Sequence, residues 1–150
     1  MKKNILISFL LLFVGLCMKA QQTSMTIDNQ TPGWLSSKIN YGDQQTVEKL
    51  KVTGFINAAD IVFLRELNTR HALVDLDLSG TRIVAGGGYY ADGQYCKTED
   101  DVMGRCMWGD FSYFKKLSLP PVKELSEKCF ASAIYDRYSM LEVDTLILNG

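Results

Sequence analysis

The sequence predicts an α/β fold in which short parallel strands stack as the rungs of a solenoid. The first observation is a spacing of apolar residues, apolar-x-x-apolar-x-apolar, that occurs four times along the chain. Each copy precedes a pair of residues that favours a turn. The second observation is an amphipathic helical pattern between the first two copies, as expected when strands alternate with helices on an outer side.

The four copies define the expected strands. They read VEKLKVTG from Val47, LVDLDLSG from Leu73, FKKLSLPP from Phe114 and VDTLILNG from Val143. The intervals between their central leucines are 26, 41 and 29 residues. Those intervals lie near the leucine-rich repeat period of about 20–29 residues, with one long insertion. Because one strand cannot bury its apolar face alone, we expect the copies to stack in parallel around a shared core.

The residues between the inward positions of each copy are expected to face solvent. They are Lys49 and Lys51, then Asp75 and Asp77, then Lys116. A basic, acidic, basic order on neighbouring strands favours ion pairs across the sheet. We take these five residues as a candidate interaction surface, with direct ligand binding by the two aspartates as the alternative to ion pairing.

The first twenty residues predict a secretory signal, residues 1–20. Lys2 and Lys3 precede the apolar segment ILISFLLLFVGL, and Ala20 is a small residue at the expected cleavage site. Twelve helical residues span about 18 Å, which is too short for a hydrocarbon layer of roughly 30 Å, so we expect no permanent membrane span. Lipid attachment at Cys17 is the less favoured alternative, because Leu16 precedes it. The protein is therefore expected to be secreted or held at the cell surface.

The charge and the cysteine and histidine content of the chain limit which partners and cofactors we expect. Removal of residues 1–20 leaves 13 basic and 17 acidic residues, a net charge of −4, so we expect no nucleic-acid partner. The remaining cysteines are Cys96, Cys106 and Cys129, an odd number that leaves at least one thiol unpaired, and their spacing does not decide whether two of them form a disulfide. With a single histidine and no C-x-x-C motif, we predict no metal and no cofactor.

The rest of the chain is divided into an N-terminal linker, residues 21–30, and a repeat region, residues 31–150. TPGWLSSKI predicts a short capping helix with Thr31 as its cap and Pro32 as its first residue. Trp34, Leu35 and Ile39 are expected to face the core from this helix, which would cover the open side of the first rung.

The segment INAADIVFLREL predicts a second, amphipathic helix on the outer side. Asn57 is its expected cap, and Asp60 stands three residues later, as in a capping box. The long insertion then contains AGGGYYADGQY, whose three consecutive glycines exclude a helix interior. Its Tyr89, Tyr90 and Tyr95 either contact a partner or lie against the repeat's own side, and we add them to the candidate interaction surface.

A second regularity occupies the last third of the chain. MGRCMW from Met103 and LSEKCF from Leu125 are 22 residues apart and are expected to be equivalent pieces of successive repeats. The stretch MGRCMWGDFSYFKKLSLPP resembles the BspA-like class of leucine-rich repeats of bacterial surface proteins, with Phe111 where that class has a cysteine. LSEKCFASA resembles it with Ser126 for glycine and Ala133 for cysteine. The likeness, capping region included, covers residues 31–150.

The resemblance implies a non-catalytic, surface-exposed protein that binds proteins or host surfaces. The alternative is a structural capping segment of a larger surface protein whose later repeats do the binding. A secreted hydrolase would need two carboxyls about 5–9.5 Å apart in a cleft. A repeat sheet offers a shallow face to any pair among Asp75, Asp77, Asp100 and Asp101, so we predict that the protein is not an enzyme.

The fourth copy differs from the others in being apolar on both faces. Ile147 stands at the outward position that Lys51, Asp77 and Ser118 hold in the earlier copies. An exposed apolar strand invites pairing with another chain, and natural repeats close such an end with a polar cap. After an N-terminal cap and about four rungs, we therefore expect either that the protein continues beyond residue 150 or that it self-associates through its last strand.

Overall fold

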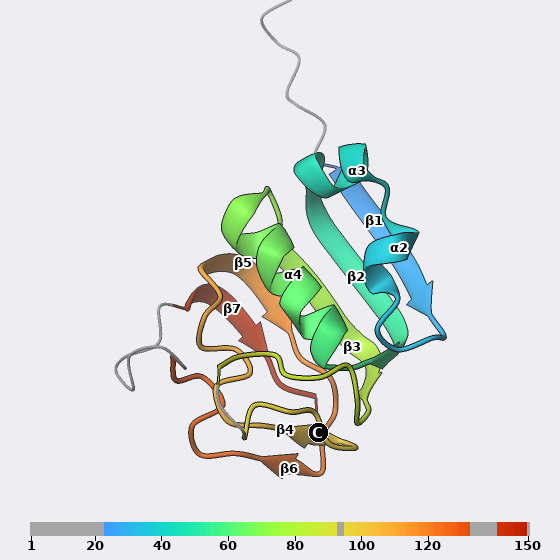
Figure 1. The fold of residues 1–150 in the computed structure, drawn as a ribbon. Coiled ribbons are helices and arrows are strands. Elements are labelled where there is room, and N and C mark those ends of the chain that lie inside the picture. Colours follow the sequence, from blue (N-terminus) through green and yellow to red (C-terminus); the bar gives the residue numbers. More distant parts are fainter. Residues whose placement is uncertain (1–22, 93–94, 133–140, 150) are drawn as a thin grey trace, which may run out of the picture.

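A computed structural model describes residues 23–92, 95–132 and 141–149, so the predicted signal and Cys17 lie outside the described residues. Five parallel strands form one sheet in chain order: β1 (Thr23–Asn29), β2 (Val47–Ile56), β3 (Asp75–Ile83), β5 (Tyr113–Ser118) and β7 (Glu142–Ile147). Helices α2 (Leu35–Lys38) and α4 (Ala58–Arg70) lie over one face of this sheet, and α3 (Tyr41–Thr46) lies at its upper end in Figure 1. The α/β class and the parallel stacking of the strands are thus confirmed.

The repeated template sets the register of the sheet. Leu50 pairs with Leu76, Leu76 with Leu117, and Leu117 with Leu146, always between parallel strands. The first three of these leucines are at most 1% exposed and belong to the core. Leu146 is 44% exposed, because β7 is the edge strand of the sheet. The template therefore predicts the inward face correctly, and the core ends at β7.

The residues predicted to be a linker form strand β1. In β1 the half-buried Met25 and Ile27 alternate with exposed Ser24, Thr26 and Asp28, a period of two that is typical of a strand with one buried face. Met25 pairs with Leu50, so β1 adds a fifth strand beside β2. The linker assignment for residues 21–30 is wrong for this part of the chain.

Two of the predicted turns are also wrong, because β2 and β3 continue through Thr53-Gly54 and Ser79-Gly80. Gly54 has a φ of +89°, and an added Cβ there would lie 2.6 Å from the carbonyl oxygen of Asn29. A register shift between β2 and β3 accompanies this glycine. The glycine lets the strand run on beside its neighbour instead of ending it. Pro120, by contrast, follows the end of β5 as predicted.

Helix α4 agrees with the sequence prediction. Its N-cap is Asn57, and the Asn57 and Asp60 side chains form the expected capping box. Ile61, Leu64 and Leu67 are fully buried against the sheet. The apolar stripe of α4 therefore belongs to the core of the protein.

The capping helix starts later than predicted. Helix α2 begins at Leu35, and Trp34 is its N-cap residue and is 62% exposed. The backbone N–H groups of Gly33 and Leu35 donate to the Asp60 carboxylate, at 2.6 and 3.0 Å, which holds the preceding residues in a turn. Leu35 is buried, as expected. The sequence predicts that this helix covers the open side of β2. Because β1 pairs with β2 on that side, α2 packs against β1 and α4 instead.

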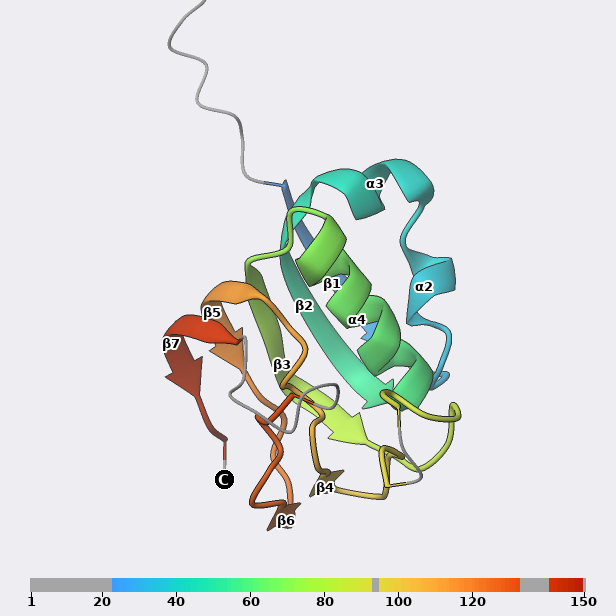
Figure 2. The ribbon, with the colours of Figure 1, turned by 60° about the vertical axis from the view of Figure 1, so that its left-hand side comes forward.

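A second, two-stranded parallel sheet contains β4 (Val102–Met103) and β6 (Glu124–Leu125) and lies at the end of the molecule opposite α3 (Figure 2). Met103 pairs with Leu125, which is the predicted 22-residue offset. The stacking continues beyond the strands, since the Trp108 N–H donates to the Cys129 carbonyl at 2.9 Å. The predicted equivalence of the two segments is confirmed.

Candidate interaction surface

The five charged residues singled out in the sequence lie in two rows across the sheet, on the face away from α4. Lys49, Asp75 and Lys116 are aligned on β2, β3 and β5. Lys51 and Asp77 are aligned two residues further along, on the same face. The predicted shared surface and its parallel register are both present.

The predicted ion pairs across the sheet are present between β2 and β3. The Lys51 ammonium lies 3.2 Å from the Asp77 carboxylate, and the Lys49 ammonium lies 4.0 Å from that of Asp75. All four side chains remain partly exposed, so each pair contributes little to stability. Within the described part of the chain, Lys116 forms no ion pair, which leaves its ammonium group accessible to a partner.

Asp77 is held in place by its own strand as well as by Lys51. Its carboxylate accepts hydrogen bonds from the Ser79 backbone N–H at 2.9 Å and from the Ser79 hydroxyl at 2.6 Å. Partial burial acts to raise the pKa of Asp77, but the hydrogen bonds from Ser79 and Lys51 outweigh it and keep the pKa below the ordinary aspartate value. Asp77 is therefore ionised at neutral pH and fixed in orientation.

Ser118 departs from the predicted surface. It is aligned with Asp77 on one side and Ile147 on the other, but it is only 4% exposed. Its small side chain lies between two longer ones, which shield it from solvent. The charged surface therefore ends at Lys116 on β5.

The three tyrosines of the insertion separate into two groups. Tyr89 and Tyr95 are 53% and 74% exposed, whereas Tyr90 is 1% exposed. The Tyr90 hydroxyl donates to the Arg105 carbonyl at 2.7 Å, and its N–H donates to the Cys96 carbonyl. Placing Tyr90 on the interaction surface is therefore wrong, because the insertion folds this ring into the core. Tyr89 stays outside, with the Lys97 ammonium 4.6 Å from its ring centre.

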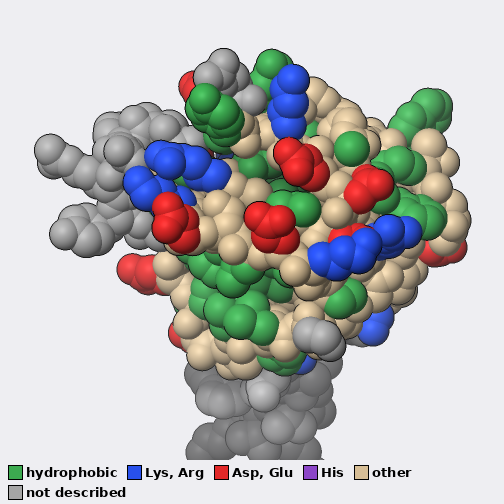
Figure 3. Space-filling model, turned by 90° about the horizontal axis from the view of Figure 1, so that it is seen from below, with side chains coloured by type: hydrophobic (Ala, Val, Ile, Leu, Met, Phe, Trp, Pro, Cys, Tyr) green, Lys and Arg blue, Asp and Glu red, His purple; other side chains and the backbone are tan. Residues whose placement is uncertain are grey.

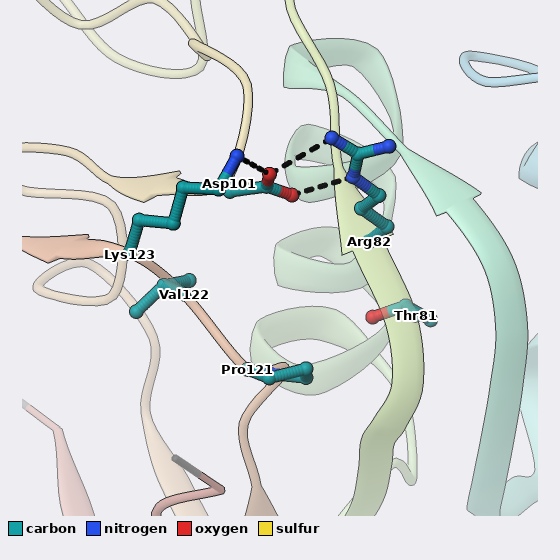
Figure 4. Close-up of a pocket in the computed structure, with 6 residues that line it drawn as sticks. All are labelled: Thr81, Arg82, Asp101, Pro121, Val122 and Lys123. Carbon is teal, nitrogen blue, oxygen red and sulfur yellow. Dashed lines mark hydrogen bonds and ion pairs between the residues drawn. The ribbon is translucent and has the colours of Figure 1, made fainter.

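A shallow pocket of about 360 Å³, which the sequence did not reveal, lies between the last residues of β3 and the segment that follows β5. Figure 3 looks at this end of the molecule and shows acidic and basic side chains close together among apolar ones. The pocket is lined by Thr81, Arg82, Asp101, Pro121, Val122 and Lys123. In Figure 4, Arg82 and Lys123 approach Asp101 from two sides.

Asp101 is the centre of this pocket's charge network. Arg82 donates two hydrogen bonds to its carboxylate, at 2.6 and 2.8 Å, and the Lys123 ammonium lies 2.7 Å from it. The hydrogen bonds from Arg82 and then Lys123 hold the pKa of Asp101 well below the ordinary value. Asp101 is consequently ionised at neutral pH, and its carboxylate holds Arg82 and Lys123 in place at the pocket.

The carboxylates considered for a hydrolase do not form a free pair. Asp75 and Asp77 lie beside lysines on the sheet face, and Asp101 is bound by two cations. Asp100 accepts a hydrogen bond from the Ala85 N–H at 2.9 Å. All four carboxylates therefore make structural contacts.

Neither a metal-binding cluster among the described residues nor a matching relative indicates a function for this chain. Among residues 23–92, 95–132 and 141–149, no three His, Cys, Asp or Glu side chains are placed to hold a metal ion. No helix in the same ranges is long and apolar enough to cross a membrane. No protein-family model and no curated protein matches the chain. The charged sheet face and the pocket are thus the features from which a function can be inferred.

Proposed function

We propose that this protein is an exported, non-catalytic interaction protein of the leucine-rich repeat type. It binds a protein ligand, on a host surface or in the extracellular matrix, through the exposed face of its sheet. Support comes from the in-register leucines of β2, β3, β5 and β7 and from the resemblance of MGRCMWGDFSYFKKLSLPP to repeats of bacterial surface proteins. Export is proposed from the layout of residues 1–20.

The observation that carries the proposal is the charged row of Lys49, Asp75 and Lys116. Strands in a parallel sheet lie about 4.8 Å apart, so the row presents alternating charges at a regular spacing on a fixed backbone. Two of the charges neutralise each other in part, and Lys116 remains available. Such a face favours a partner with acidic side chains, and its attraction is screened by salt.

The test measures binding of the protein, starting at Gln21, to immobilised fibronectin, laminin and collagen. We expect one of these ligands to bind, and Lys116→Glu to weaken that binding about tenfold, the effect of 1.4 kcal/mol. Arg70→Ala is the matched control, because Arg70 is an exposed basic residue on α4, on the other side of the sheet. We expect this control to bind like the unmodified protein.

Two results would count against the proposal. Equal weakening by Lys116→Glu and Arg70→Ala would show that the sheet face is not the binding surface. A protein that is folded by circular dichroism and binds none of the ligands would overturn the proposed function and favour a structural role in a larger surface assembly.

A further inference from the structure

The open edge of β7 leaves apolar side chains exposed at one side of the larger sheet. Leu146, Ile147 and Leu148 are 44%, 36% and 61% exposed and are consecutive; together we call them the apolar edge. The residues aligned with Leu146 on the preceding strands of the sheet, Leu117 on β5 and Leu76 on β3, are fully buried. The ladder of core leucines therefore reaches the last strand, and the next layer is missing from the described residues.

The backbone of the apolar edge has a definite direction. The Ile147 carbonyl accepts a hydrogen bond from the Leu119 N–H at 2.9 Å, so the backbone groups of Ile147 face β5. Successive residues of a strand direct these groups to alternate sides. The N–H and C=O groups of Leu146 consequently face away from the sheet, and extending the same alternation one residue beyond β7 directs those of Leu148 the same way.

We propose that two copies of this chain pair antiparallel through their apolar edges, around a two-fold axis at Ile147. In this register Leu146 of one copy lies opposite Leu148 of the other, and the two Ile147 residues face each other. The proposal is independent of the proposed ligand-binding function, because the charged face lies on β2, β3 and β5.

The hydrogen bonds and the apolar side chains together favour this register. Two residues opposite each other in an antiparallel ladder exchange two hydrogen bonds when their backbone groups face the partner strand. Leu146 and Leu148 meet that condition, so the two symmetric pairings give four hydrogen bonds between the copies. The leucines meet on the core side of the sheet, and the isoleucines meet on the other side, so every side chain of the apolar edge gains an apolar neighbour.

Registers centred nearer the start of β7 would bring its acidic residues, Glu142 and Asp144, into the paired segment. An axis at Asp144 would place the two copies of that carboxylate opposite each other, and an axis at Val143 would place Glu142 opposite Asp144. Like charges in directly opposed positions destabilise a sheet. An axis at Ile147 leaves both acids outside the paired segment. Asp144 is also engaged within its own copy, where it accepts the Tyr113 hydroxyl at 2.6 Å.

The other open edge of the sheet is a poorer partner for β7. Strand β1 exposes Ser24, Thr26 and Asp28, and its apolar Met25 and Ile27 are already half-buried. Pairing β7 of one copy with β1 of another would therefore bury less apolar surface than pairing two β7 strands. It would also repeat without closing, whereas a two-fold contact closes at the dimer.

Cross-linking tests the register directly in the protein starting at Gln21, which contains every described element. Ile147→Cys places two thiols in a non-hydrogen-bonded pair, with Cα atoms about 4.5 Å apart, within disulfide range. We expect a covalent dimer under mild oxidation. Thr145→Cys is the control, because its two copies would lie about 13 Å apart along the strands. A dimer from both variants, or from neither, would overturn the register.

Sedimentation tests the association itself. We expect the unmodified protein to dimerise, and Ile147→Glu and Ile147→Lys each to weaken the dimer at least tenfold, because like charges then meet on the axis. An equimolar mixture of the two variants should recover a dimer. Thr26→Glu on β1 should dimerise normally. A monomer at high concentration would overturn the proposal and leave the apolar edge to a further segment of the same chain or to a different protein.

Discussion

Asp60 is 1% exposed, yet its carboxylate connects three separate segments of the chain. It accepts hydrogen bonds from the backbone N–H groups of Gly33, Leu35 and Asn57, at 2.6, 3.0 and 3.0 Å. These groups belong to the turn before α2, to α2 itself and to the cap of α4. A side chain recognisable in the sequence as half of a capping box thus also fixes where the preceding helix begins.

Replacing Asp60 should destabilise the protein strongly. Asp60→Ala leaves three N–H groups without their acceptor, and each buried unsatisfied group costs about 1–3 kcal/mol, so we expect the free energy of unfolding to fall by about 3 kcal/mol or more. Asp43→Ala is the control, because the Asp43 side chain bonds to Asn40 on an exposed helix end. Urea denaturation measures both, and similar losses would contradict the assigned role.

The charge on Asp101 predicts a dependence of stability on pH. Its pKa is lowered in the folded state, so its contribution is fully present above the unfolded value of about 3.9 and is lost as the pH falls toward the folded value. We expect Asp101→Asn to lower the melting temperature at neutral pH, and the difference to shrink below about pH 4. Asparagine tolerates the φ of +59° at this position, so the backbone is retained. Calorimetry at several pH values measures the difference in melting temperature between the two proteins. A difference that stays constant with pH would refute the prediction.

At the scale of elements, stacking in register explains both sheets. The leucine ladder aligns β2, β3, β5 and β7, and the 22-residue offset aligns β4 with β6. In each case the same spacing of apolar residues recurs, so equivalent side chains of neighbouring strands lie side by side. The faces of a strand can therefore be assigned residue by residue.

The two faces of β3 should respond differently to truncation. Leu76 is fully buried, so Leu76→Ala should lower the free energy of unfolding by about 2–5 kcal/mol. Asp77 is partly exposed beside Lys51, so Asp77→Ala should lower it by about 1 kcal/mol or less. Chemical denaturation of the two variants compares them, and equal losses would argue against the assigned faces.

The contact between the stacked segments around β4 and β6 depends on Gly109. An added Cβ there would lie 1.7 Å from the Ala131 carbonyl oxygen, a backbone atom that cannot easily move away. We expect Gly109→Ala to destabilise by at least about 1–3 kcal/mol. Gly42→Ala in α3, where the nearest atom is 3.4 Å away, should be neutral or slightly stabilising. Thermal melting measures both variants, and equal melting temperatures would contradict the role assigned to Gly109.

For the whole molecule, the parallel order and register were predictable because the template repeats four times. Strand β1 was not, since its six-residue alternation is short and no second copy repeats it. The burial of Tyr90 was not predictable either, because its hydroxyl bonds to the Arg105 carbonyl far along the chain. The pocket depends in the same way on Arg82 and Asp101, 19 residues apart. Local patterns identify repeated strands, whereas contacts made once between distant residues leave no such pattern.

The proposed export makes a prediction about the whole chain. A secretory signal in residues 1–20 would be removed, so the exported protein should begin at Gln21, two residues before β1. Intact-mass measurement of the protein recovered outside the cytoplasm would show this. A mass that includes a lipid on Cys17 would instead support anchoring, and retention of the full chain in the cytoplasm would contradict export.

Cys96, Cys106 and Cys129 are free thiols and are all buried. Burial raises the pKa of Cys96 and that of Cys129, which lowers the fraction of each present as the reactive thiolate, and a buried thiol reacts only when its surroundings open. In an oxidising compartment the folded protein would therefore keep three reduced thiols, while an unfolded copy would form mixed disulfides. Unfolding would then be irreversible, so the lifetime of the protein outside the cell would be set by how fast it opens and not by its equilibrium stability.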